Sequence, residues 1–230
     1  VNQGIITITG TTINDISGEV EMSISDVAVT TIRLKQTSPT TGGVYTCIDA
    51  SIKGDVDYED GYTSLNTVKG MSFTLDDNSS ARIDTDGSLY TSSEAIEDII
   101  ITAKIADISG LLTVTADPKY LENLDILLDD KTTTLITLNI GDRVQVSGQA
   151  SLLAEVSNDD FIIDNSISWS QVDVGHTGIT TIGDNKGTIF ALKPGTTQLI
   201  GTCGGKQAIA IIEVEGEADL DAIQINDGSD

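Results

Sequence analysis

The chain has 230 residues and carries 36 acidic against 12 basic side chains, giving a net charge of −24. A chain this acidic repels nucleic-acid phosphates and anionic lipid surfaces, which argues against nucleic-acid binding and membrane insertion. The sequence holds no run of about 18 uninterrupted apolar residues, so no transmembrane helix is expected. The charge itself leaves three readings open: solubility at high concentration or in a salt-rich habitat, binding of a divalent cation, or a basic partner.

The composition favours strands and turns. Aromatic residues make up 4% of the chain and there are three prolines, while Thr, Ile, Val, Ser, Asp and Gly are abundant. These residues form strands and turns rather than helices. The sequence therefore predicts an all-β protein, long enough for one large or two ordinary domains. It begins at Val1 without the pattern of a signal peptide, so we expect a processed product or a fragment of a longer chain.

Two segments of alternating apolar and polar residues lie near the start, at 4–9 and 19–24. They belong to no complete module, and a strand without a partner presents a hydrogen-bonding edge that seeks a sheet. Residues 1–27 are therefore predicted to be an N-terminal strand segment. Either it pairs with a neighbouring subunit by strand donation, or it is an extra strand of its own domain or part of a neighbouring module.

Regularly spaced short strands punctuated by Gly, Asp and Ser follow in residues 28–116, and the pattern returns in residues 117–216. This spacing is typical of a sandwich of antiparallel sheets. Strands are expected at 29–36 and 44–52, and the D-T-D-G sequence at 84–87 is expected to close a hairpin.

One acidic segment suggests a ligand site. Residues 54–61 read G-D-V-D-Y-E-D-G, with several carboxylates ahead of a Gly that permits a sharp turn. Hard cations such as Ca²⁺ require several such oxygens, although the spacing is not that of an EF-hand and no bidentate Glu follows. The alternative is a solvated acidic loop. The candidate Ca²⁺ ligands are Asp55, Asp57, Glu59 and Asp60.

The segment 167–214 is the most distinctive. Trp169 lies in an alternating strand and is followed by D-N-K-G at 184–187 and by A-L-K-P-G-T at 191–196. This resembles the C-terminal half of a bacterial immunoglobulin-like module of group 2. The resemblance implies a β-sandwich that spaces, displays and packs rather than one that catalyses. Residues 134–146 resemble the family's two strands joined by Gly141-Asp142, and 29–36 with 44–52 are interpreted as the same pair in the first module.

The motif occurs twice in the chain, with Phe73 in place of the Trp and S-S-E-A-I-E-D in place of the K-P-G-T tag in the first copy. The aligned segments are 71–73 with 167–169, 81–83 with 180–182, 88–90 with 188–190, 99–105 with 197–203, and 112–115 with 211–214. The expected core residues are Phe73, Ile83, Leu89, Ile101, Val114, Trp169, Ile182, Ile189, Leu199 and Ile211.

Little in the sequence indicates reactive chemistry. Cys47 and Cys203 fall in different modules, so no disulfide within a sandwich is predicted and both are expected to be buried thiols. A bridge between the modules would need the two halves to fold back on each other. A Ser-His-Asp arrangement would depend on the one histidine, His176, in a polar turn. The sequence holds no phosphate loop, paired-Cys metal motif or H-E-x-x-H, and no enzyme is expected.

The predicted architecture is all-β, with two immunoglobulin-like β-sandwich modules in tandem (28–116 and 117–216) and extra strands at both ends. Residues 217–230 are read as a strand or the start of a further module. The predicted function is a non-enzymatic structural subunit or repeat of a microbial extracellular assembly: a filament, surface layer or adhesive stalk. Its copies would associate through edge or donated strands. The alternative is an accessory surface protein of a tailed-phage virion, on the capsid, tail or fibre, that binds cell-surface glycans weakly.

Overall fold

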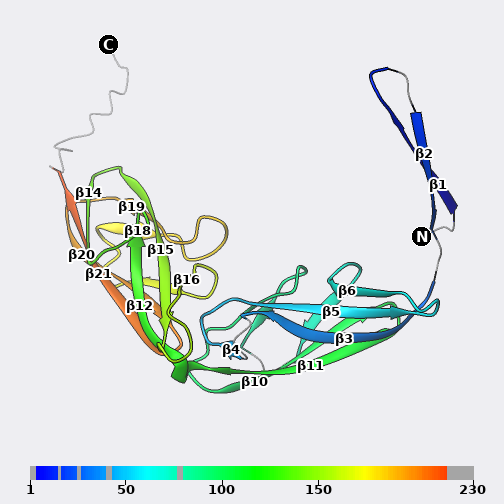
Figure 1. The fold of residues 1–230 in the computed structure, drawn as a ribbon. Coiled ribbons are helices and arrows are strands. Elements are labelled where there is room, and N and C mark those ends of the chain that lie inside the picture. Colours follow the sequence, from blue (N-terminus) through cyan, green and yellow to red (C-terminus); the bar gives the residue numbers. More distant parts are fainter. Residues whose placement is uncertain (1–3, 15–16, 25–26, 40–42, 77–79, 217–230) are drawn as a thin grey trace, which may run out of the picture.

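The computed structural model describes residues 4–14, 17–24, 27–39, 43–76 and 80–216. Within these ranges the protein is built from strands, and its one helical turn is the 3₁₀ segment η1 (Pro118–Tyr120). Figure 1 shows two β-sandwiches joined end to end at an angle, with a hairpin standing apart from both. The prediction of an all-β protein is confirmed. The prediction for residues 217–230 lies outside the described residues.

The first sandwich consists of two sheets. One has the strand order β3-β5-β9-β8, with β6 also paired to β5, and the other has the order β4-β11-β10-β7. The strands of the first sheet are β3 (Val29–Ser38), β5 (Ala50–Tyr58), β6 (Thr63–Thr67), β8 (Arg82–Ile83) and β9 (Ser88–Tyr90). Those of the second are β4 (Val44–Tyr45), β7 (Ser72–Leu75), β10 (Glu97–Ile105) and β11 (Ile108–Asp117).

The second sandwich follows the 3₁₀ turn. One sheet has the order β13-β12-β15-β19-β18, with β16 paired to β15, and the other has the order β14-β21-β20-β17. The first sheet contains β12 (Leu121–Leu128), β13 (Lys131–Thr132), β15 (Arg143–Leu152), β16 (Asp160–Ile162), β18 (Thr177–Ile179) and β19 (Thr188–Ala191). The second contains β14 (Leu135–Asn139), β17 (Ser168–Gln171), β20 (Gly195–Cys203) and β21 (Lys206–Glu215).

The two sandwiches have the same topology. In each, the last strand pairs antiparallel with the strand before it and parallel with a short early strand: β11 with β4, and β21 with β14. In each, the last two strands lie in the middle of a four-stranded sheet, and the other sheet follows the same order, β3-β5-β9-β8 in the first sandwich and β12-β15-β19-β18 in the second, where β13 is an additional edge strand. Two packed sheets of this kind form an immunoglobulin-like sandwich. The repeat is confirmed at its start, because Phe73 pairs with Ala103 as Trp169 pairs with Gly201.

The early strands correct one part of the alignment. The pair formed by 29–36 and 44–52 was expected to match the two strands around Gly141-Asp142. Instead β3 pairs along β5, as β12 pairs along β15, so β3 is the counterpart of β12. The short β4 is the counterpart of β14, because both lie parallel to the last strand of their sandwich.

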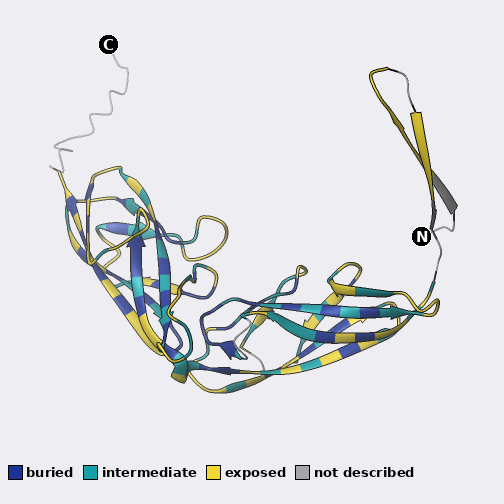
Figure 2. Ribbon diagram, viewed as in Figure 1, coloured by how far each residue is buried: buried dark blue, intermediate teal, exposed yellow. Residues whose placement is uncertain are grey.

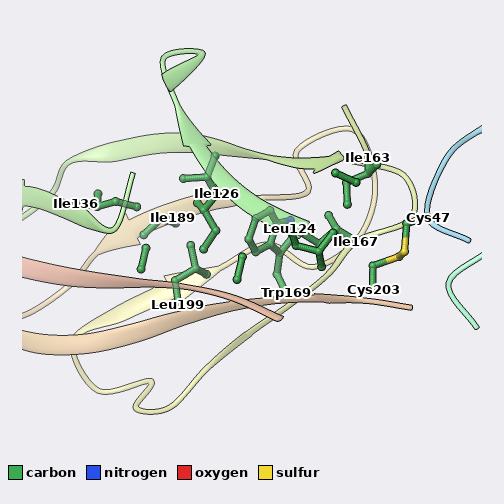
Figure 3. Packing of buried hydrophobic residues seen from close by; sticks show 14 of the residues in the cluster. Cys47, Leu124, Ile126, Ile136, Ile163, Ile167, Trp169, Ile189, Leu199 and Cys203 are labelled. Carbon is green, nitrogen blue, oxygen red and sulfur yellow. A yellow bond between two sulfur atoms is a disulfide. The ribbon is translucent and has the colours of Figure 1, made fainter. Parts of the chain in front are cut away.

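Each sandwich has its own hydrophobic core. Figure 2 shows the alternation of buried and exposed residues along the strands that produces these cores. Of the predicted core residues, Leu89, Ile101, Trp169, Ile189 and Leu199 are buried, and Phe73, Ile83 and Val114 pack partly buried against the first core. Figure 3 shows how Trp169 lies in the second core, among Leu124, Ile167 and Leu199.

The prediction of a core position is wrong for two residues. Ile211 is 41% exposed, and Ile212 and Val214 face the core instead. The prediction failed because the sequence alignment placed β21 one residue out of register. A displacement of one residue in a strand moves every side chain to the opposite face. Ile182 is 79% exposed because the turn between β18 and β19 is longer than its counterpart between β8 and β9. Ile179, which pairs with Ile189, holds the position that Ile83 holds opposite Leu89.

The N-terminal strands β1 (Gly4–Thr11) and β2 (Ser17–Ile24) form an antiparallel hairpin. Ile8 lies opposite Val20, and both side chains are about half exposed. Among the strands that the structure describes, these two pair with each other alone. The predicted strands are therefore present, while their pairing with a neighbouring subunit stays a prediction.

Candidate functional site

The junction between the sandwiches is closed by a disulfide. Cys47 follows β4 in the first sandwich and Cys203 ends β20 in the second, and their sulfurs are bonded across a sequence separation of 156. The prediction of two unbonded buried thiols is wrong. The halves do not fold back on each other; the turn after β4 meets the end of β20 at the place where the sandwiches join (Figure 3).

The apolar part of this junction belongs to the second core. Tyr45, Cys47 and Ile48 come from the first sandwich, yet they pack in the hydrophobic cluster of the second. The Tyr45 ring meets the Tyr120 ring edge to face, with centroids 5.5 Å apart. Such aromatic pairs contribute beyond the area they bury. The bridge is therefore enclosed: Cys47 is 0% and Cys203 3% exposed.

Backbone contacts add to the apolar ones. The Gly204 amide donates to the Ser92 carbonyl across the junction at 3.2 Å, and the Cys47 amide donates to the Thr91 carbonyl at 2.8 Å. Gly204 has a φ of +55°, and a Cβ there would lie 3.1 Å from the Cys47 sulfur. The turn after β20 therefore favours glycine for two reasons, the left-handed backbone and the closeness of the bridge.

The polar part of the junction centres on Asp49. Its carboxylate accepts hydrogen bonds from Asn165 Nδ2 at 3.4 Å and from Ser166 Oγ at 3.3 Å, both in the second sandwich. Burial raises the pKa of Asp49, and the two hydrogen bonds oppose that shift. Lys186 Nζ donates to the Asn165 carbonyl at 3.2 Å, and burial lowers the pKa of Lys186.

A cleft of about 520 Å³ opens beside this network. Its wall on the side of the first sandwich carries Arg82, which also stands 4.5 Å from the centre of the Tyr90 ring. Its other wall includes the long turn between β18 and β19. The lining residues are Arg82, Asp84, Gln145, Asp164, Asn165, Thr181, Ile182, Gly183, Asp184 and Lys186. The lining thus combines cationic and amide donors with carboxylate acceptors, which suits a ligand that has both donors and acceptors.

The candidate calcium ligands lie on and just after β5, away from the cleft. The Asp57 carboxylate is paired with the Arg33 guanidinium through two hydrogen bonds, and it also accepts from Thr63 Oγ1 at 2.8 Å. The hydrogen bond from Arg33 lowers the pKa of Asp57 to about 2.

Asp55 has a similar environment. Its carboxylate accepts from Lys35 Nζ at 2.8 Å and from the Asn66 amide at 2.9 Å, and these bonds lower its pKa. Asp60 instead accepts from the Tyr62 amide within its own turn, and Glu59 is exposed. Across the described ranges no three His, Cys, Asp or Glu side chains gather as metal ligands would. The calcium prediction stays a prediction.

His176 lies in the turn before β18, as the sequence indicated. Its Nε2 is 3.7 Å from an Asp173 carboxylate oxygen, and its backbone carbonyl accepts from the amides of Leu192 and Lys193. The ring also stands where a Cβ at Gly195 would lie, 2.3 Å from that position. These contacts give His176 a packing role at the start of β20.

No protein family matches the chain, and no curated protein is similar to it. Among solved structures, it is similar to the S-layer protein rSbsC(31-844), with 11% identity, a TM-score of 0.32, and coverage of 93% of this chain and 35% of the other. It thus spans about a third of that protein's length. A structure of SbsC domains 4 and 5 gives 13% identity, a TM-score of 0.34, and coverage of 82% and 99%.

A C-terminal 282-residue fragment of intimin, solved with the intimin-binding domain of its translocated receptor, gives 13% identity and a TM-score of 0.29. That likeness covers 81% of this chain and 64% of the fragment. All three TM-scores are below 0.5. No helix among the described residues is long and apolar enough to cross a membrane.

Proposed function

We propose that this protein is a non-enzymatic structural unit of a microbial extracellular assembly, such as a filament, surface layer or adhesive stalk. The observation that carries the proposal is the junction, where two sandwiches of the same topology share apolar packing and a buried disulfide. Two domains joined in this way form a spacer of fixed geometry. Disulfides persist in oxidising surroundings, which supports an extracellular or cell-surface location.

The N-terminal hairpin supports self-association. A two-stranded hairpin alone is marginally stable in water, because it has no third strand or core to cover its apolar side chains. Ile8 and Val20 face each other on the exposed hairpin, while Thr7 lies opposite Glu21 on the neighbouring pair. An edge or face of this kind is completed by another sheet. A neighbouring copy of the same chain is the proposed partner.

The test is the mass of the purified chain in solution, with electron microscopy of the same sample, with and without calcium. Filaments, sheets or large oligomers support the proposal, and Ile8→Lys should reduce them. Thr7→Lys, on the adjacent and more polar pair, is the matched control and should leave them intact. A monomer of 24.2 kDa under all conditions would contradict self-assembly and favour a passive module of a virion or of a larger surface protein.

The cleft favours a second function, weak binding of a cell-surface glycan. Sugar hydroxyls both donate and accept hydrogen bonds, and the lining offers Arg82 and Lys186 as donors beside Asp84 and Asp164 as acceptors. A panel of neutral and acidic saccharides should show binding that Arg82→Ala weakens. The control Lys104→Ala, on β10 outside the cleft, should bind as the parent does. Equal loss in both variants, or no binding by the parent, would exclude the cleft as a glycan site.

A further inference from the structure

The disulfide creates a short covalent route through the molecule. Cys47 and Cys203 are 156 positions apart, and most of both sandwiches lies between them in the sequence. On the route itself lie β3 and β4 before Cys47, and β21 after Cys203. We use the name tension path for three parts taken together: residues 29–47, the disulfide bridge, and residues 203–215. Every other strand of the two sandwiches lies in the covalent loop that the bridge closes.

The tension path runs the length of the paired sandwiches. In Figure 1, β3 extends from the end of the first sandwich near the hairpin toward the junction, and β21 extends from the junction to the far end of the second. Each of these strands has ten residues. Strands rise about 3.3 Å per residue and are already close to full extension. A pull on the two ends therefore meets little slack in β3 and β21.

The two long strands of the path are held in place by their neighbours. β3 pairs with β5 from Val29 to Ser38, and β21 is paired on both sides, with β20 and with β14. The bridge at its centre is buried from solvent, so a dissolved reductant has poor access to the sulfurs while the junction is folded.

From these observations we propose a mechanical function: the chain transmits tension through β3, the Cys47–Cys203 bond and β21, while the loop of residues 48–202 carries none. Without the bridge, the same pull would pass through every strand in sequence and would have to be resisted by hydrogen bonds and packing. With the bridge, covalent bonds resist it. The sandwiches then act as the folded support that keeps the path straight and the bridge enclosed.

Transmission of tension is independent of self-assembly, because it depends on the topology of one molecule. Force-clamp measurements on the single 230-residue chain, fused at both ends to marker domains, test it directly. In the oxidised chain, only residues 1–47 and 203–230 can lengthen, so complete extension should add at most about 26 nm. Reduction should release residues 48–202 and add a further step of roughly 54 nm at about 3.5 Å per residue.

Two further measurements keep the result clear. The variant Cys47→Ser/Cys203→Ser should lengthen fully without reductant; if it does not fold, adding a thiol reductant to a stretched parent molecule gives the same comparison. That addition should produce one discrete step of the hidden length. An oxidised chain that releases the full length of all 230 residues would overturn the proposal. So would a parent whose extension is unchanged by reductant after residues 1–47 and 203–230 have been pulled out and the bridge is exposed.

Discussion

Trp169 illustrates how one large residue organises the second core. It pairs with Gly201 on β20, and a Cβ at position 201 would come within 2.9 Å of the indole Cζ3. The absence of a side chain there makes room for the ring. Phe73 has the same place in the first sandwich opposite Ala103, but it is only partly buried.

Replacing Trp169 by Ala should therefore strongly destabilise the second sandwich. A change from a large to a small side chain in a packed core costs about 3–5 kcal/mol of unfolding free energy. Urea denaturation, followed by circular dichroism, measures this loss of unfolding free energy in the second sandwich. Val172→Ala, at an exposed position just beyond the same strand, is the control and should change stability little. A Trp169→Ala variant that unfolds with the parent would show that the core assignment is wrong.

Asp57 gives a prediction on pH. Its pKa is lowered to about 2 by the hydrogen bond from Arg33, so the folded state favours the charged carboxylate relative to the unfolded state. The stabilisation is complete above the unfolded pKa of about 4, and it is lost as pH falls from there through the folded pKa. The urea midpoint of the parent should therefore fall between about pH 4 and pH 2.

The control for this prediction is Asp57→Asn, which cannot ionise. The variant should lose less stability than the parent over the same interval, and NMR titration of the Asp57 carboxyl should give the low pKa directly. An ordinary titration of Asp57 near pH 4 would contradict the ion pair as described. The pair is exposed to solvent, so added salt should weaken it.

At the scale of strands, alternation predicted most elements correctly but did not determine every register. The segment 206–215 contains apolar residues on both faces, since Ile209 and Ile211 are exposed while Ala208, Ala210 and Ile212 are buried. A pattern that is apolar on both sides gives no signal for which face meets the core. The prediction of the turn between β18 and β19 was wrong for another reason. No local sequence signal gives the length of this turn, and Ile182 within it has the apolar character of a core residue.

A pair of adjacent substitutions tests the corrected register. Ile212→Ala removes a fully buried side chain and should cost about 2–5 kcal/mol, whereas Ile211→Ala lies on the exposed face and should cost far less. Thermal or urea unfolding of both variants gives the comparison. If Ile211→Ala is the more damaging of the two, β21 has the opposite face toward the core.

For the whole molecule, the bridge is the feature that sequence reasoning missed. Both cysteines were expected to be buried, which they are, but their pairing depends on how two separate sandwiches meet. No local pattern around Cys47 or Cys203 contains that information, because the contact joins residues 156 positions apart. The cleft beside the junction was missed for the same reason. Arg82 and Lys186 come from different sandwiches.

Reduction of the bridge should lower the unfolding free energy by about 2–5 kcal/mol, because a bond closing so long a loop restricts the unfolded chain. Urea titrations with and without a phosphine reductant measure the difference. The double variant Cys47→Ser/Cys203→Ser should be insensitive to the reductant. Equal loss on reductant in parent and double variant would mean that the effect does not come from this bond.

The most direct test of the covalent junction is a tryptic digest of the native chain under non-reducing conditions, after alkylation of any free thiols. We expect one linked pair, residues 36–53 joined to residues 187–206, since the Lys193-Pro194 bond resists trypsin. The pair should separate into its two peptides on reduction. Two separate peptides, each alkylated at Cys47 or Cys203 before any reductant is added, would contradict the covalent junction and the function that follows from it.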